Sequence, residues 1–145
     1  MKYLSYIYMP IVLALLMLAN SSCTRNNGDI GPWFGTWRVD YILIDDDPDP
    51  DYGPPYMIWK FQSSVIQIQV PDFDSHTETT VTGIWHQDDD LLTINFDWGH
   101  GTPPAMSHLP VETKLNIIKL SHSTIELQFV DDNNITYFYK LQKWG

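Results

Sequence analysis

The amino-acid sequence predicts an all-β protein: an eight-stranded antiparallel up-and-down barrel that follows an N-terminal signal segment. Apolar side chains alternate with polar ones along most of the chain after residue 30, and no stretch there keeps a helical period of about 3.6 residues. The segments that connect these runs mostly alternate between long and short. Strands with one apolar face each can close into a barrel, which removes exposed edges. The expected strands are 36–44, 57–62, 65–70, 77–86, 91–97, 112–120, 124–130 and 135–142.

The first four strands are rich in β-branched and aromatic residues, which favour strands. The first should end where a run of aspartates begins at Asp45. The second and third flank a turn at 63–64, and the third alternates most clearly, with isoleucines against Gln67 and Gln69. The fourth is a threonine-rich run. The side chains expected to face inward are Trp37, Val39, Tyr41 and Leu43, then Met57, Trp59 and Phe61, then Ile66, Ile68 and Val70, and then Val81, Gly83 and Trp85.

The last four strands keep the period of two. The fifth ends before a loop rich in Gly and Pro, and the sixth begins after that loop. Polar turns, which contain the Ser, Asp and Asn residues that turns favour, separate the final three. The side chains expected to face inward here are Leu92, Ile94 and Phe96, then Ile118 and Leu120, then Ile125, Leu127 and Phe129, and then Ile135, Tyr137, Tyr139 and Leu141.

The connections indicate which end of the barrel carries function. Alternate connections of a meander lie at the same end, so the tight turns should gather at one end and the long loops at the other. Binding residues concentrate on long loops that a rigid scaffold positions. The tight turns are 63–64, 87–90 and 121–123, and the opposite end has 45–56, 71–76, 98–111 and the shorter 131–134.

The N-terminus has the pattern of an export signal. The run 7–19 is almost wholly apolar but too short to span a membrane, which takes about 20 residues. Small residues and the only cysteine, Cys23, follow it, which resembles a bacterial lipobox, although Asn20 stands where Leu is usual. We expect a lipoprotein signal peptide at 1–22, an acylated tether at 23–30 and the barrel domain at 31–145. The alternative is a plain signal peptide and an unrelated cysteine.

The charge balance limits the partners. The chain has 18 Asp and Glu against 8 Lys and Arg, for a net charge of −10. Such a surface repels nucleic acid and anionic lipid, so we expect no nucleic-acid partner and expect the membrane to be reached through the acyl group on Cys23. We therefore expect a lipid-anchored protein of a bacterial cell envelope, held in the outer membrane. It could face either the periplasm or the cell surface.

The start of the first strand carries a family resemblance. Gly35-Thr36-Trp37 opens that strand after a short turn at 30–34, and the tail 114–142 resembles the last three strands of bacterial lipocalin-like domains. The chain thus resembles a small bacterial lipocalin-like lipoprotein of the calycin superfamily. The resemblance implies that Trp37 plugs the closed end of the barrel and that a late basic residue packs on it. Lys140 and Lys143 are the candidates, and alternation points Lys140 outward. The resemblance implies a binding role and supplies no catalytic residues.

The acidic stretch 44–55 raises the question of a calcium loop. Its alternate aspartates start like an EF-hand, but Tyr52 stands where that loop needs glycine and Ile58 where it needs glutamate. We interpret it as a solvated loop stiffened by prolines, with a lid that prefers cations or polar ligands as the alternative.

The histidines do not predict a metal site or an enzyme. Three of them, His76, His100 and His108, fall in the long loops, but the spacing within 98–111 matches no recognised ligand pattern. No order of Ser, His and Asp or of Cys and His indicates a nucleophile. We therefore expect no metal, no cofactor and no catalysis.

The long-loop end is the predicted ligand site. Large apolar side chains inside an acidic rim suit a small apolar or amphipathic ligand that is neutral or cationic. The many inward rings favour a packed lower barrel with a shallow pocket near the mouth over a deep calyx. The alternative function is a structural or interaction lipoprotein whose loops contact an envelope protein or a glycan. The predicted mouth residues are Tyr52, Tyr56, Phe73, Trp98 and Met106.

Overall fold

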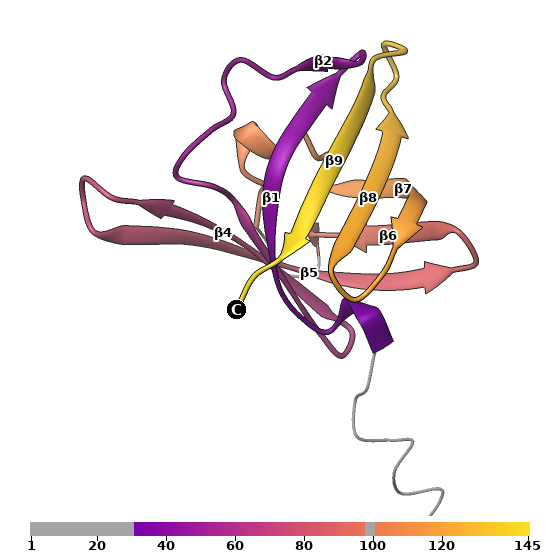
Figure 1. Cartoon of the computed structure of the whole chain (residues 1–145), viewed down its shortest axis with the longest axis horizontal. Coiled ribbons are helices and arrows are strands. Elements are labelled where there is room, and N and C mark those ends of the chain that lie inside the picture. The colour runs from indigo at the N-terminus through magenta and orange to yellow at the C-terminus, as the bar shows by residue number, and fades with distance from the viewer. Residues whose placement is uncertain (1–30, 98–100) are drawn as a thin grey trace, which may run out of the picture.

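The computed structural model describes residues 31–97 and 101–145. Its strands follow one another around a strongly twisted barrel (Figure 1). The predicted signal peptide at 1–22 and tether at 23–30 lie outside the described residues. The elements are the 3-10 helix η1 (Gly31–Trp33), β1 (Gly35–Ile44), β2 (Asp47–Pro48), β3 (Ile58–Gln62), β4 (Val65–Asp72), β5 (Thr77–Asp88), β6 (Leu91–Asn95), the 3-10 helix η3 (Ala105–Ser107), β7 (Glu112–Leu120), β8 (Thr124–Val130) and β9 (Thr136–Lys143).

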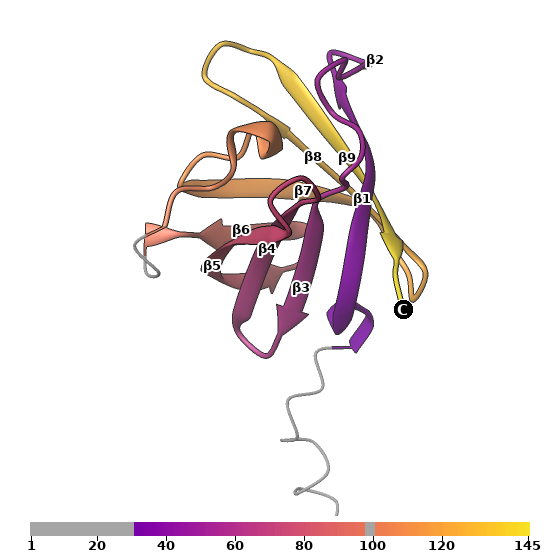
Figure 2. The same ribbon diagram turned by 90° about the vertical axis from the view of Figure 1, so that its left-hand side faces the viewer.

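The sheet confirms the predicted eight-stranded antiparallel meander. Its order is β2-β1-β3-β4-β5-β6-β7-β8-β9, and a further pairing of β1 with β9 closes the ring. The view in Figure 2 shows the first and last long strands side by side. The two-residue strand β2 pairs only with the end of β1, at Leu43 and Ile44, and stands outside the closure.

The strand boundaries agree with the predicted ranges most closely late in the chain. Strands β7 and β8 have the predicted bounds. Strand β5 begins as predicted but runs on to Asp88, which pairs with Leu91 of β6. Strand β4 runs two residues further than predicted because its ladder with β5 continues through Pro71↔Glu78 to Asp72↔Thr77. The result is a hairpin arm that projects beyond the barrel (Figure 1).

A β-bulge in β1 changes which side chains of the first predicted strand face inward. The register against β9 shifts between Val39 and Tyr41. Because an extra residue reverses the alternation beyond it, Ile42 is buried in the core and Tyr41 is 42% exposed. The prediction that Tyr41 and Leu43 face inward is therefore wrong. Tyr41 instead stacks on Phe138 outside the barrel, with ring centroids 6.4 Å apart.

A second β-bulge, in β7, changes which side chains of the sixth predicted strand face inward. The register of β7 against β8 shifts between Ile117 and Lys119. Ile118, predicted inward, is 54% exposed, whereas Leu120 packs partly buried against the core. Leu115, which the sequence analysis did not assign to the core, is fully buried.

The tight-turn end is plugged by aromatic rings. The Trp37 side chain is fully buried, and its indole Nε1–H donates to the carbonyl of Trp33 at 3.0 Å. The Lys143 ammonium lies 4.7 Å from the centre of the Trp37 ring and also donates to the Phe34 carbonyl. Gly35, at φ 114°, permits this approach, since a Cβ there would lie 2.5 Å from Lys143 Nζ. Of the two candidate basic residues, Lys143 is therefore the one that covers the tryptophan.

None of the helices in the described ranges is long and apolar enough to cross a bilayer.

Candidate functional site

A folded loop covers the long-loop end of the barrel. Its 3-10 helix η3 buries Ser107, whose hydroxyl donates to the Pro104 carbonyl at 2.6 Å. The hydroxyl of Tyr139, from the interior face of β9, donates to the Ser107 carbonyl. Burial of that ring raises the pKa of Tyr139 well above its ordinary value. The loop is therefore fixed to the core, and Leu109 beside it belongs to that core.

One aspartate of the acidic stretch fastens this loop. The side chain of Asp49 is almost completely buried, and its Oδ2 lies 2.7 Å from His108 Nε2. Its Oδ1 accepts a hydrogen bond from the Asp51 backbone N–H at 3.0 Å. The prediction that the whole stretch is a solvated loop is wrong at this residue, because a histidine from a distant loop compensates the buried carboxylate. The neighbouring Asp45 to Asp47 and Asp51 are exposed, as that prediction expects.

Four stacked rings connect the loop to the strands. The His108 imidazole stacks on Tyr137 with centroids 5.1 Å apart, and Tyr137 stacks on Phe129 at 5.0 Å. Phe129 in turn stacks on Tyr139 at 6.2 Å. The pKa of Tyr137 is raised, first by partial burial and then by the carboxylate of Asp131. These rings form one wall of the upper barrel.

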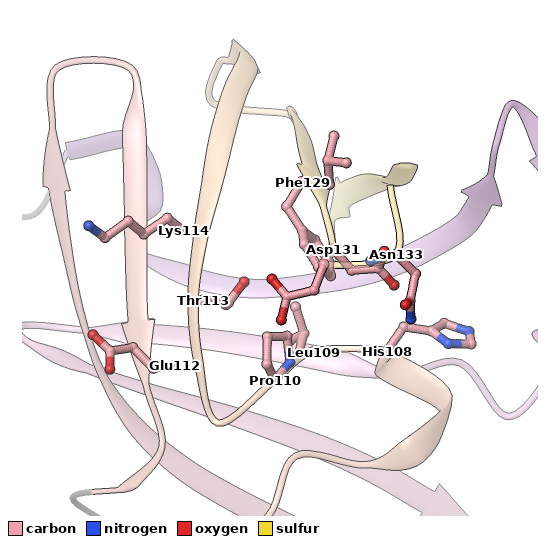
Figure 3. Close-up of a pocket in the computed structure, with 11 residues that line it drawn as sticks. His108, Leu109, Pro110, Glu112, Thr113, Lys114, Phe129, Asp131 and Asn133 are labelled. Carbon is pink, nitrogen blue, oxygen red and sulfur yellow. Dashed lines mark hydrogen bonds between the residues drawn. The ribbon is translucent and has the colours of Figure 1, made fainter. Parts of the chain in front are cut away.

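The barrel wall opens beside this stack. The ladder between β7 and β8 begins only at Asn116↔Gln128, so the first residues of β7 pair with β6 alone. A hollow of about 690 Å³ lies where the two strands separate. Residues 112–114 lie on one side of it, residues 129–133 on the other, and residues 108–110 between them (Figure 3).

The hollow combines apolar side chains with an acidic rim. Leu109 and Phe129 supply buried apolar surface, and Thr113 is buried beside them. The carboxylates of Glu112, Asp131 and Asp132 outnumber the single ammonium of Lys114. A volume of this size lies within the usual range of small-ligand pockets, about 300–1,000 Å³. The site can therefore hold a small amphipathic molecule, and its charge favours a neutral or cationic one.

The predicted mouth residues occupy different places. Phe73 and Met106 line a second hollow of about 480 Å³ at the same end, beside Asp72 and Asp74. The hydrogen bond from the Ser75 side chain, and then those from the backbone N–H groups of Ser75 and Asp74, lower the pKa of Asp72. The structure thus brings together two of the five residues there.

Tyr52 and Tyr56 are in contact with each other, with ring centroids 6.2 Å apart, but neither lines either of these hollows. The Tyr52 hydroxyl donates to the Val39 carbonyl and accepts from the Met57 N–H, and burial raises its pKa. The Arg38 guanidinium covers the Tyr56 ring at 5.3 Å. The fifth predicted residue, Trp98, lies outside the described residues.

Metal ligation finds no support in the described ranges, where no three His, Cys, Asp or Glu side chains come together as a metal ion requires. His108 is engaged with Asp49, and His76 is exposed on the turn between β4 and β5. His100 lies outside those ranges.

The sequence analysis missed His108, Leu109, Thr113 and Asn133 as residues of the larger hollow. Phe129 was predicted to face inward and the aspartates at 131 and 132 to rim the mouth, but the separation of β7 from β8 has no local sequence signal.

The closed antiparallel meander, with a tryptophan plug and a lysine on it, defines a lipocalin-like fold. Two solved structures share it. A lipocalin-like protein from Bacteroides uniformis ATCC 8492 superposes with a TM-score of 0.62 at 14% identity, over 79% of this chain and 100% of that one. An uncharacterized protein from Bacteroides eggerthii DSM 20697 gives a TM-score of 0.53 at 14% identity, over 77% of this chain and 99% of that one. No family model and no curated protein matches the chain.

Proposed function

We propose that this chain is a lipocalin-like binding protein that holds a small amphipathic ligand, neutral or cationic, in the hollow between β7 and β8. The observation that carries the proposal is the interrupted β7–β8 ladder, which leaves about 690 Å³ at the long-loop end. Apolar Leu109 and Phe129 would contact the ligand body, and the carboxylates of Asp132 and Glu112 would attract a cationic head.

The filled interior favours a lateral site over a deep calyx. Large rings occupy the barrel below the hollow, and the loop with Ser107 covers its upper end. Displacing each of those rings from the core would cost about 3–5 kcal/mol, which the binding free energy of a small ligand does not readily offset. A ligand would therefore enter from the side. The fully buried rings are Trp37, Trp59, Phe61, Phe96 and Tyr139.

The same packing favours one alternative. A barrel with a filled interior can serve as a rigid scaffold whose loops contact an envelope protein or a glycan. The exposed turn side chains of Asp132 and Asn133 would then meet the partner directly. Under either function the chain is not an enzyme in our proposal, and acylated Cys23 anchors it in a bacterial cell envelope.

Binding of a cationic amphiphile tests the proposal. Octyltrimethylammonium is titrated into the full chain, and backbone amide NMR shifts of Thr113 and Asn133 report occupation of the hollow. Asp132 and Glu112 are exposed and make no side-chain hydrogen bond to the residues that the structure describes, so neutralising them should leave the fold intact. One charge about 4 Å away contributes about 1 kcal/mol in water, so Asp132→Asn should weaken binding about five-fold.

The matched control is Asp88→Asn, which removes an exposed charge at the opposite end of the barrel. Its affinity should equal that of the parent chain. Equal weakening in both variants would mean that only the overall charge matters, and saturating shifts confined to other residues would disprove the placement.

A further inference from the structure

A groove lies on the outer wall of the barrel, apart from the hollow between β7 and β8. It occupies about 660 Å³ over the outer faces of β1, β3 and β4 and is closed on one side by the loop with Pro54, Pro55 and Tyr56. Figure 2 shows these three strands together. Phe73 and Trp144, at 67% and 52% exposure, also line it. Two large exposed rings beside one apolar groove indicate a surface that a partner covers.

Ile58 shows that the groove is apolar to its base. Its neighbours Met57 and Trp59 face the core, so Ile58 faces outward by alternation. It is nevertheless only 5% exposed, although it does not belong to the interior cluster. The loop at Pro54–Tyr56 therefore covers it from outside, and a ligand in the groove would contact this same cover.

Lys60 places a positive charge at one end of the groove. The ladder sets it opposite Thr36 on one side and Gln67 on the other, both neutral. Its ammonium makes no hydrogen bond or ion pair within the described ranges. Arg38, the other cation there, already pairs with Asp40 at 2.7 Å. An ammonium without a carboxylate partner can pair with an anionic group of a ligand.

The one acidic side chain that lines the groove is remote from Lys60. Glu78 stands opposite Pro71, whereas the β5 residue level with Lys60 is Thr82, four residues further along that strand. Four residues of strand span about 13 Å. The carboxylate also accepts a hydrogen bond from the Thr80 hydroxyl at 3.2 Å. The Lys60 end is therefore locally positive on an otherwise acidic protein, with apolar surface leading away from it.

We propose that this outer groove is a second binding site, for an amphiphile with an anionic head such as a medium-chain carboxylate. The head pairs with Lys60, and the acyl chain lies along Tyr56 and Pro71 toward Phe73. The site differs from the hollow between β7 and β8 in place and in sign of charge. It does not depend on the function proposed for that hollow.

Octanoate titrated into the full chain is the direct test, with the indole N–H of Trp144 as the NMR reporter. That signal is assigned with Trp144→Phe, and Trp144 does not line the hollow between β7 and β8. We expect a saturable shift with octanoate, a weaker response to octanol and none to acetate. Lys60→Gln should lower the affinity for octanoate about five- to ten-fold and leave that for octanol unchanged.

Lys119→Gln is the matched control, because Lys119 is an exposed lysine on β7 outside the groove. Its octanoate affinity should equal that of the parent chain. Equal affinities for octanoate and octanol, or an unchanged octanoate affinity in Lys60→Gln, would overturn the proposal. Saturating shifts at Thr113 and Asn133 instead of Trp144 would also overturn it and would assign octanoate to the other hollow.

Discussion

Both the indole N–H and the ring face of Trp37 interact with neighbouring residues. Its indole N–H donates to the Trp33 carbonyl, and its ring face carries the Lys143 ammonium. Such cation–π contacts contribute about 0.5–1 kcal/mol at exposed sites and more when desolvated. The residue thus joins the chain's entry into the barrel to its last strand.

Replacing Trp37 with alanine should lower the free energy of unfolding by about 3–5 kcal/mol, since a large cavity would remain in a packed core. Denaturant unfolding measures this. Trp144→Ala, which truncates an exposed indole, serves as the control and should cost far less. A loss under about 1 kcal/mol at Trp37 would contradict its role as a plug.

The buried hydroxyl of Tyr139 makes the stability of the fold depend on pH in the alkaline range. Burial raises the pKa of its hydroxyl in the folded state, while the unfolded value stays near the ordinary value of about 10. The folded state therefore holds the proton more tightly, and this stabilisation is complete below about pH 10 and is lost as the pH rises above it. Unfolding free energies measured from about pH 9 to 11.5 should fall less steeply in Tyr139→Phe than in the parent chain.

At the scale of elements, the loop with η3 depends on one contact between loops. The carboxylate of Asp49 and the imidazole of His108 lie 59 residues apart and meet at 2.7 Å. Because Asp49 is buried, loss of its partner leaves an uncompensated carboxylate, whereas loss of both partners removes the conflict.

A double-mutant cycle of Asp49→Asn and His108→Asn should therefore give a coupling free energy of about 1 kcal/mol or more. Asparagine suits position 108, where φ is 59°. The pair of Arg38 and Asp40, also at 2.7 Å but partly open to solvent, supplies the comparison and should couple by about 0.5 kcal/mol. Equal coupling in the two cycles would show that burial of Asp49 adds nothing.

Elements with strict alternation were predictable, and those with an irregularity were not. Alternation assigned Ile66, Ile68, Leu92 and Ile94 to the core correctly, because each strand there has a continuous ladder. It failed after Val39 and near Ile118, where a bulge reverses the faces. Bulges respond to barrel curvature, which is a property of the whole sheet. For the candidate site, the sequence indicated the long-loop end, where the hollow lies. It did not indicate the gap between β7 and β8 that forms the hollow.

On the scale of the whole molecule, the chain's attachment to a membrane is still a prediction. Its basis is the lone Cys23 directly after an apolar run and small residues. The Cys23→Ser chain, expressed in a bacterial host, should leave the membrane fraction and remain soluble, because a net charge of −10 gives it no affinity for anionic lipid. Fractionation followed by immunoblotting measures this, with Ser22→Ala as the matched control. Continued sedimentation with membranes would show that the anchor lies elsewhere.

The pairing of β1 with β9 has a consequence for the order of events during synthesis. The contact between Lys143 and Phe34 joins residues 109 positions apart, so the ring cannot close until Lys143 has emerged. Contacts this distant in sequence slow folding, since a long stretch of chain must be ordered before they form. A nascent chain would thus stay unclosed until β9 has emerged, so that the export predicted from residues 1–22 could pass it through a narrow channel before the barrel forms.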